Sequence, residues 1–575
     1  MAGNLPALKS LPGGLTALAL WRGAARQVRR EWAGSPMHRW TLIRPRPDGL
    51  AAKPSDPRPT DPAAGRMILD GRYVMGGGTL EVGRRGDPWD RPSPNRRFAQ
   101  ALHRFEWMAD LLTVGTEGAA EALRLQLEWA RVFGRWNGFS WSQDILEYRV
   151  FNLACGIHAM ASRASDVEAA QITLDLARQA RHLLSAIDGP VRAAEQAVAA
   201  TLAGTVLAGE AGELLVDSGL LRLERALYET VRPDGGHASR SAMAALDLLL
   251  DLQALDDALV QRGVAPPEEM MRAMDRLSGA VRFFTLSDGA LPNLQGGEAC
   301  PPAYVAAARC SQDSAARPPS ARNGYQRLEA RSLQILADAA PPSTGAWSVT
   351  ACAQPLAIEI LAGGRRLVSA CGWTPEAQGP QAMRLVDAAS SASFADMACG
   401  EPLRGFRASA LGPRLVGADY EVEARRHEAP GALWLELSHN GWERRVNLRH
   451  DRRLYLDLAA DELRGEDRFV PTGPEPTTPE GRRFIPFMVR FHVPPNVQAS
   501  LARDGKSVLL KTEGEGNGWW LRNDAREVAL ESSVCFEDGQ ARRSQQIVLR
   551  GQARLDSGAK VRWKLAAAEA WPPPH

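Results

Sequence analysis

The sequence has little cysteine and very little lysine, and each shortage argues against a class of protein. Its seven cysteines contain no CxxC pair, which argues against a zinc ribbon, a thioredoxin-type redox motif or a disulfide scaffold. We therefore expect free thiols, either buried or kept reduced by the compartment. Only six of the 69 cationic residues are lysines, and 67 residues are acidic. The formal net charge of +2 argues against a protein that binds polyanions through net charge alone.

Long apolar runs and nucleotide-binding motifs are also missing. No run reaches the roughly 18 apolar residues that a membrane-spanning helix requires. The apolar stretch at residues 11–21 is interrupted by Pro12-Gly13-Gly14 and followed by arginines, so we predict no signal peptide. The chain contains no GxxxxGK[ST], no strand-linked GxGxxG, no HExxH, and no helix-turn-helix or zinc-finger pattern. We expect no cofactor, no transmembrane segment and no nucleic-acid partner.

The N-terminal region reads as a basic amphipathic helix followed by a linker and a hairpin. In residues 15–32 (LTALALWRGAARQVRREW), Arg22, Arg26, Arg29 and Arg30 lie towards one side. Such a helix can make peripheral contact with an anionic membrane, or it can pack its apolar stripe on its own protein, which we favour. Residues 44–64 are rich in Pro, Asp and Ala and predict an irregular connection. Residues 65–83 alternate and contain glycine turns, which predicts a small hairpin.

The rest of the chain changes its hydrophobic period once. From about residue 95 to 279, apolar residues recur at helical spacing, with short polar or glycine-bearing links between the segments. After about residue 324, short segments alternate with a period of two, and turn residues bound them. We predict an α then β multidomain protein. Residues 1–94 hold the basic helix, linker and hairpin, 95–322 an α-helical domain, and 323–575 an antiparallel β-sandwich.

Several local strings resemble the heparinase II/III-like family of polysaccharide lyases. The resemblance covers most of the chain from about residue 65 onward. The strings are GDPWD near residue 87, RWNGFSW near residue 136, PDGGHASRS (233–241), NGYQRLEA (323–330), LSHNGWERRVNLRHDRRLYLD (437–457), ELRGEDR (462–468), RFHVPPNVQASLARDGKSVLL (490–510) and RRSQQIVLRG (542–551).

This resemblance implies an incomplete (α/α) toroid that holds a sugar cleft, capped by an antiparallel β-sandwich. It also implies cleavage of uronate-containing acidic glycans by β-elimination. That chemistry needs a group that neutralises the uronate carboxylate, a general base, and a general acid that is usually a tyrosine. An acidic polysaccharide or oligosaccharide is then the expected partner.

The resemblance places candidate site residues in both domains. His237 is the expected base or carboxylate neutraliser, with Arg240 able to grip a carboxylate in a bidentate manner. Tyr304 and Tyr325 are the candidate acids, and Tyr325 is expected mainly to seat the sandwich. The candidate substrate-binding residues are Asn137, Trp136, Arg149, Asn152 and His439, with Trp141 nearby.

Each candidate also has a plain structural interpretation. Ser239 or Ser241 could cap a helix while His237 braces the turn, and the other polar residues could serve helix packing. Active relatives often carry a Tyr-His pair soon after the His237 motif, whereas this chain reads AMAA at residues 242–245. The family's metal segment falls at residues 387–396, where no histidine stands, so we expect no metal even though His450 and His492 are present.

Three functions therefore stay open. The first is an active lyase, and the second is a non-catalytic glycan-binding or envelope scaffold that keeps the fold. The third is a glycoside hydrolase that uses carboxylates in the toroid, with Glu147 beside Arg149 as the candidate. The resemblance favours a periplasmic or envelope location, whereas the lack of a predicted signal peptide favours the cytoplasm.

Overall fold

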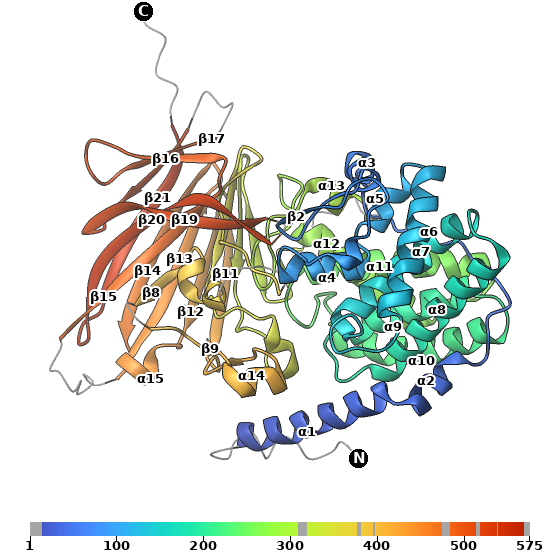
Figure 1. The fold of residues 1–575 in the computed structure, drawn as a ribbon. Helices are drawn as coiled ribbons and strands as arrows, with labels where there is room; N and C mark the ends of the chain where they lie inside the picture. The colour runs from blue at the N-terminus through green and yellow to red at the C-terminus, as the bar shows by residue number, and fades with distance from the viewer. Residues whose placement is uncertain are drawn as a thin grey trace, which may run out of the picture.

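The computed structural model describes residues 14–308, 319–375, 381–394, 397–473, 483–512, 518–537 and 539–568. A helical block and a block of sheets lie side by side, with the N-terminal helix along one edge of both (Figure 1). The predicted order of an α block followed by a β block is confirmed. The six cysteines among these residues are free thiols, and Cys310 lies outside them.

The N-terminal region contains the predicted helix, whereas the hairpin predicted over residues 65–83 is confined to residues 72–81, because residues 62–69 form a helix. Helix α1 (Gly14–Gly34) packs Leu15, Leu18 and Ala19 on a small apolar cluster that includes Leu411 of the sheet block. The other elements of this region are α2 (Pro36–Ile43), α3 (Pro62–Leu69), β1 (Arg72–Met75) and β2 (Gly78–Glu81), and the last two pair antiparallel. None of the helices in the described part of the chain is long and apolar enough to cross a membrane.

The helical block is the (α/α) toroid, built around an alanine-rich helix. All fourteen residues of α9 (Ala193–Val206) are buried, because its sequence AAEQAVAATLAGTV is mostly small or apolar, and Glu195 and Gln196 are its only long polar side chains. It packs against α7, α8, α10 and α11. The other helices are α4 (Arg96–Arg104), α5 (Met108–Leu112), α6 (Thr116–Phe133), α7 (Gln143–Ala161), α8 (Asp166–Ala186), α10 (Glu210–Thr230), α11 (Ala242–Arg262), α12 (Glu268–Phe284) and α13 (Pro302–Ala306).

The β block stacks antiparallel sheets over a second apolar core. A five-stranded sheet adjoins the toroid and runs in the order β3 (Ala321–Arg322), β4 (Tyr325–Glu329), β5 (Leu333–Asp338), β6 (Ile358–Ala362) and β7 (Arg365–Val368). A four-stranded sheet runs in the order β19 (Glu527–Glu537), β20 (Gln540–Arg554), β15 (Phe484–Val493) and β8 (Ala392–Phe394). Strands β9 (Glu401–Pro402) and β10 (Leu415–Val416) form a separate pair on either side of α14 (Gly405–Leu411).

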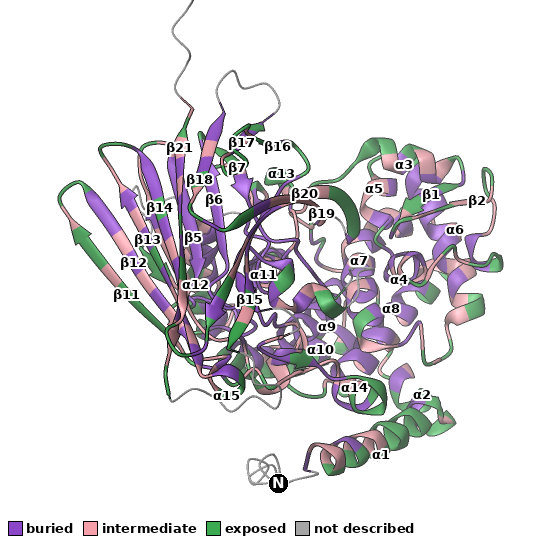
Figure 2. Cartoon of the chain, turned by 90° about the vertical axis from the view of Figure 1, so that its left-hand side faces the viewer, coloured by how far each residue is buried: buried purple, intermediate pink, exposed green. Residues whose placement is uncertain are grey.

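The third sheet has eight strands, and one of its faces is turned to solvent. Its order is β11 (Val422–Ala429), β12 (Ala432–His439), β13 (Leu448–Asp457), β14 (Glu462–Pro471), β21 (Ala559–Ala567), β18 (Trp519–Asn523), β17 (Val508–Thr512) and β16 (Val497–Leu501). Helix α15 (Glu443–Val446) lies between β12 and β13. In β13 every second side chain is buried, and the residues between them are at least partly exposed (Figure 2). This alternation is the pattern of a half-buried strand.

Candidate functional site

A groove of about 1160 Å³ lies between α1, the toroid and the end of α14. Its walls come from α1 and α2, from the loop between α6 and α7, from the link between α8 and α9, and from residues 410–414 at the end of α14 and just after it. Eight arginines and two aspartates line it: Arg22, Arg26, Arg29, Arg30, Arg96, Arg181, Arg192, Arg414, Asp144 and Asp188. Its excess of cations suits an anionic ligand, although the net charge of the whole chain is small.

Some of these arginines hold the walls of the groove together. Arg29 of α1 forms an ion pair with Asp188, and Arg26 donates to the carbonyl oxygens of Ser409 and Ala410. Arg181 of α8 donates to two carbonyl oxygens of the segment after α2, those of Leu42 and Pro45. Within the described part of the chain, Arg30 and Arg96 form no ion pair. These two exposed cations are free to meet a ligand.

Three tryptophans, Trp32, Trp136 and Trp141, and the turn at Asn137 line the groove. The ring of Trp136 lies next to Gly34, where an added Cβ would be 3.5 Å away. Asn137 accepts from the backbone amides of Phe139 and Ser140 and donates to Ser140 Oγ at 2.6 Å, so its side chain shapes the turn. Both Trp136 and Asn137 line the groove.

A histidine pair at the groove braces α2 against α8. His38 Nε2 lies 2.8 Å from His182 Nδ1, and the ring of Trp141 meets the ring of His182 edge-on. Burial lowers the pKa of His182 to about 4 and also lowers the pKa of His38. Both rings are therefore neutral near pH 7, and the positive charge of the groove comes from its arginines.

Arg192 is the site residue that the sequence analysis missed. It stands before the first turn of α9 with a left-handed backbone (φ 58°), and its guanidinium pairs with the buried carboxylate of Glu147. Glu195 lies 3.9 Å from the same guanidinium. Glu147, the candidate carboxylate of a hydrolase, is thus engaged with an arginine at the groove. A lone arginine before an alanine-rich helix carries no sequence signal for this role.

Two other predicted substrate-binding residues lie inside the toroid. Arg149 is fully buried, donates to Gln179 Oε1 and to the carbonyl oxygen of His103, and covers the ring of Trp129. Asn152 donates to the carbonyl oxygen of Arg104. Neither residue lines the groove. Their contacts are those of helix packing.

His237 and Arg240 lie where the toroid meets the sheets. His237 is buried, its Nδ1 contacts Ser239 Oγ at 2.7 Å, and its ring meets Trp347 edge-on. Burial lowers its pKa to about 4. Ser241 caps α11 by accepting from the amide of Ala244, which is the structural alternative for this turn. His237 does not line the groove.

Arg240 is a clamp between the two blocks. Its Nη2 pairs with the buried Asp338 Oδ1 at 2.5 Å, and its remaining donors reach the carbonyl oxygens of Asn323, Gly324, Ala340 and Pro341. The guanidinium therefore has an acceptor for each of its five N–H groups and none left for a substrate carboxylate.

The candidate tyrosines are also engaged elsewhere. Tyr304 Oη accepts from Arg58 Nε at 2.8 Å and donates to Asp247 Oδ1 at 2.9 Å, inside the toroid. Tyr325 Oη donates to the carbonyl oxygen of Arg240. Burial is the main reason that the pKa of each phenol lies well above its ordinary value. No tyrosine of the described residues lines the groove.

Three histidines of the sheet block, His439, His450 and His492, are core residues. His439 is buried between Tyr420, Trp442 and His450, so it lies in the sandwich and not at the groove. His492 contacts Ser533 and the carbonyl oxygen of Asp387. Across the described ranges, no three His, Cys, Asp or Glu side chains come together as metal ligands.

Comparisons with known proteins agree on the fold. The heparinase II/III-like C-terminal domain family matches residues 315–564. FtsZ-localized protein C of Caulobacter vibrioides is 51% identical over 99% of this chain and 100% of its own length. The crystal structure of heparinase III matches 89% of this chain and 85% of its own, with 13% identity and a TM-score of 0.65. A heparan sulfate lyase HepC mutant from Pedobacter heparinus matches 94% and 88%, with 15% identity and a TM-score of 0.56. The chain belongs to the heparinase II/III-like family.

Proposed function

We propose that this protein binds an acidic glycan or glycan precursor in the basic groove and does not cleave it. The groove lined by eight arginines carries this proposal. Trp136 lies beside those arginines and offers a ring for a sugar to stack on. Arg30, Arg96 and Arg192 can meet carboxylate, sulfate or phosphate groups.

The same groove argues against β-elimination. A lyase needs a general acid within hydrogen-bond reach of the leaving oxygen. No described tyrosine lines the groove, and Tyr304 and Tyr325 are each bonded to other groups. The two groove histidines are bonded to each other, and His237 is buried outside the groove. The groove therefore contains residues that can bind an acidic glycan, but it lacks a general acid for β-elimination.

The experiment measures binding and cleavage on the same samples. A panel of heparan-type, alginate-type and bacterial exopolysaccharide ligands is titrated while ultraviolet absorbance follows unsaturated uronate. We expect salt-sensitive binding and a flat absorbance trace. The double variant Arg30→Gln/Arg96→Gln should weaken binding about tenfold, whereas Arg222→Gln on the exposed face of α10 should leave it unchanged. A rise in the ultraviolet absorbance would establish a lyase, and a lack of binding to every ligand would refute the proposal.

The relative's name suggests where this function operates. FtsZ-localized protein C aligns with the chain from end to end at 51% identity. We infer that this protein also localises with FtsZ. A fluorescent fusion expressed at its native level should follow the position of labelled FtsZ and disperse when FtsZ is depleted. A fusion that stays in place after depletion would contradict the inference.

Peripheral membrane contact through α1 is a second candidate function. One stripe of α1 packs on Leu403, Ala410 and Leu411, as favoured from the sequence. Yet Trp21 is 60% exposed and Val28 is 66% exposed, and Trp40 of α2 is 69% exposed. Helix α1 lies along one edge of the molecule and is largely exposed (Figures 1 and 2). Its exposed apolar side chains and its arginines suit the interface of an anionic bilayer.

This contact can be tested with vesicles of phosphatidylglycerol and phosphatidylcholine. The variant Trp21→Ser/Val28→Ser should lose most of its co-sedimentation with anionic vesicles. Tyr228 on α10 is 80% exposed and lies on another helix, so Tyr228→Ser is the matched control. Equal sedimentation of all three proteins would exclude α1 as the contact.

A further inference from the structure

A row of side chains crosses the outer face of the eight-stranded sheet, and we name it the aromatic–cationic row. Its members are direct cross-strand neighbours on β11, β12, β13, β14, β21 and β18: His427, Trp434, Tyr455, Arg464, Lys564 and Arg522. Three adjacent strands thus supply aromatic rings and the next three supply cations. With strands about 4.8 Å apart, the row is about 24 Å long.

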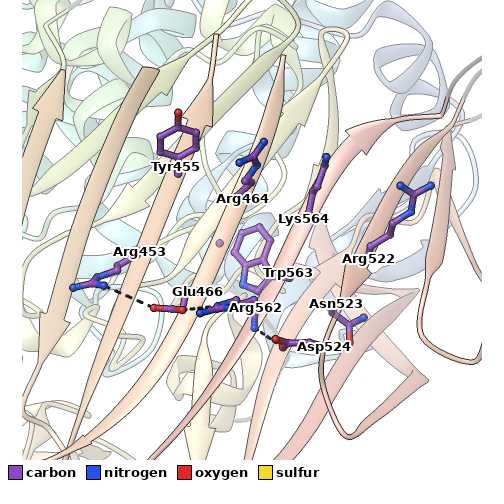
Figure 3. A pocket seen from close by; sticks show the side chains of 11 residues that line it. Arg453, Tyr455, Arg464, Glu466, Arg522, Asn523, Asp524, Arg562, Trp563 and Lys564 are labelled. Carbon is purple, nitrogen blue, oxygen red and sulfur yellow. Dashed lines mark hydrogen bonds and ion pairs between the residues drawn. The ribbon is translucent and has the colours of Figure 1, made fainter. Parts of the chain in front are cut away.

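The aromatic half of the row is a run of three neighbouring rings. The rings of His427 and Trp434 are inclined by 28° with centroids 5.5 Å apart, and those of Trp434 and Tyr455 by 25° with centroids 6.1 Å apart. Figure 3 looks onto this face and shows the ring of Tyr455 turned broadly towards the viewer. The three rings therefore stack in sequence along the row, and each of them is at least partly exposed on the outer face of the sheet. Exposed aromatic rings of this kind suit contact with the C–H faces of sugar rings.

The cationic half carries charge that its acidic neighbours neutralise only in part. Arg464 pairs with Glu462 at 2.5 Å and lies 4.0 Å from Asp457, and Lys564 shares Glu462. Arg522 forms no ion pair with any described residue, although its charge helps to lower the pKa of Asp504. Figure 3 shows Arg464, Lys564 and Arg522 side by side along the row. One end of the row therefore attracts anions.

The adjacent row on the same face has the opposite character. Arg453, Glu466, Arg562 and Asp524 alternate in sign, and Glu466 lies 2.9 Å from Arg562 and 3.9 Å from Arg453 (Figure 3). The amide of Arg562 also donates to Asp524. The two positive and two negative charges of this row therefore cancel. The hollow of about 440 Å³ between the rows is lined by five Arg or Lys residues and two acidic ones, so its surplus charge comes from the aromatic–cationic row.

We propose that the aromatic–cationic row is a second binding surface for an acidic oligosaccharide. Sugar rings stack on His427, Trp434 and Tyr455, and carboxylate or sulfate groups meet Arg464, Lys564 and Arg522. An acidic peptide would bind the cations but would make no use of the three aromatic rings. This surface lies on the sandwich, outside the basic groove, so the proposal does not depend on what the groove binds.

The test uses the full chain and a fluorescent heparin-derived hexasaccharide. Arg522→Gln should weaken its binding to the row about tenfold, because Arg522 is held by no ion pair and its loss removes a charged contact. Tyr455→Leu keeps an apolar cross-strand neighbour for Trp434 and should weaken binding severalfold through the loss of the ring. Arg449→Gln is the matched control, since Arg449 is partly exposed on β13, the strand of Tyr455, and is paired with Asp451. Thermal unfolding of each variant verifies the fold.

Four results decide the proposal. A loss of hexasaccharide binding in Arg522→Gln and Tyr455→Leu, with Arg449→Gln unchanged, supports it. A loss only in Arg30→Gln/Arg96→Gln would overturn it while leaving the groove proposal intact. Tight binding of a poly-glutamate peptide that depends on Arg522 but not on Tyr455 would replace the sugar with a peptide. Failure of the hexasaccharide to bind at millimolar concentration would also overturn it.

Discussion

Removing the guanidinium of Arg240 should destabilise the junction between the two blocks without a specific effect on ligand binding. The variant Arg240→Met leaves Asp338, which is 1% exposed, without its cationic partner. Gln295 still donates to Asp338 Oδ2 at 2.9 Å, but four carbonyl oxygens lose a donor. Breaking a buried ion pair in this way costs about 3–5 kcal/mol.

A double-mutant cycle isolates this pair. Asp338→Asn removes the charge at the other end, and the double variant Arg240→Met/Asp338→Asn leaves neither charge buried alone. We expect the double variant to be more stable than the sum of the single effects predicts, by about 1–3 kcal/mol. Urea unfolding followed by tryptophan fluorescence and by circular dichroism measures each free energy of unfolding.

The result also distinguishes a structural role of Arg240 at the junction from the catalytic role that the sequence analysis expected for it. If Arg240 instead bound substrate, the variant Arg240→Met would lose affinity or turnover and would keep its full stability. If Arg240→Met lowered the free energy of unfolding by less than about 1 kcal/mol, or if the cycle were additive, the clamp would be refuted. Arg449→Gln, which removes an exposed paired arginine, should change stability by less than about 1 kcal/mol and serves as the control.

Three further predictions concern the buried polar groups and the close packing. Burial lowers the pKa values of His182, His237 and His492 to about 4. Below about pH 6.5 these histidines therefore bind protons in the unfolded chain but stay neutral in the native protein. Stability should therefore fall between pH 6.5 and 4, by about 1.4 kcal/mol per pH unit for each histidine, and a urea midpoint that is constant from pH 7.5 to 5 would contradict this. Asp467 accepts from Arg452, His450 and Trp563 in the sandwich, so Asp467→Asn should cost about 3–5 kcal/mol, with the exposed-side Asp457→Asn as the control in the same urea assay. An added Cβ at Gly465 would lie 2.1 Å from the ring of Trp563, so Gly465→Ala should lower stability by about 1–3 kcal/mol, whereas Gly138→Ala, with open space around it, should not.

The sequence alone determined the fold class, because the period of apolar residues depends on local backbone geometry. Helical spacing before about residue 280 and alternation after about residue 324 match the helices and strands of the structure. The hairpin at 72–81 and the N-terminal helix followed from turn glycines and from amphipathic spacing. The domain limits at 94 and 322 stay predictions, although β3 begins at Ala321.

Only the tertiary structure decided which polar residues share a site. Arg240 and Asp338 are 98 positions apart, and nothing near either residue in the sequence identifies its partner. The groove likewise combines arginines of α1 with Arg192 and Arg414, which come together only when the two blocks pack. A buried arginine and a ligand-binding arginine look the same in sequence. Their roles differ because the packing of distant segments sets which acceptors surround each guanidinium.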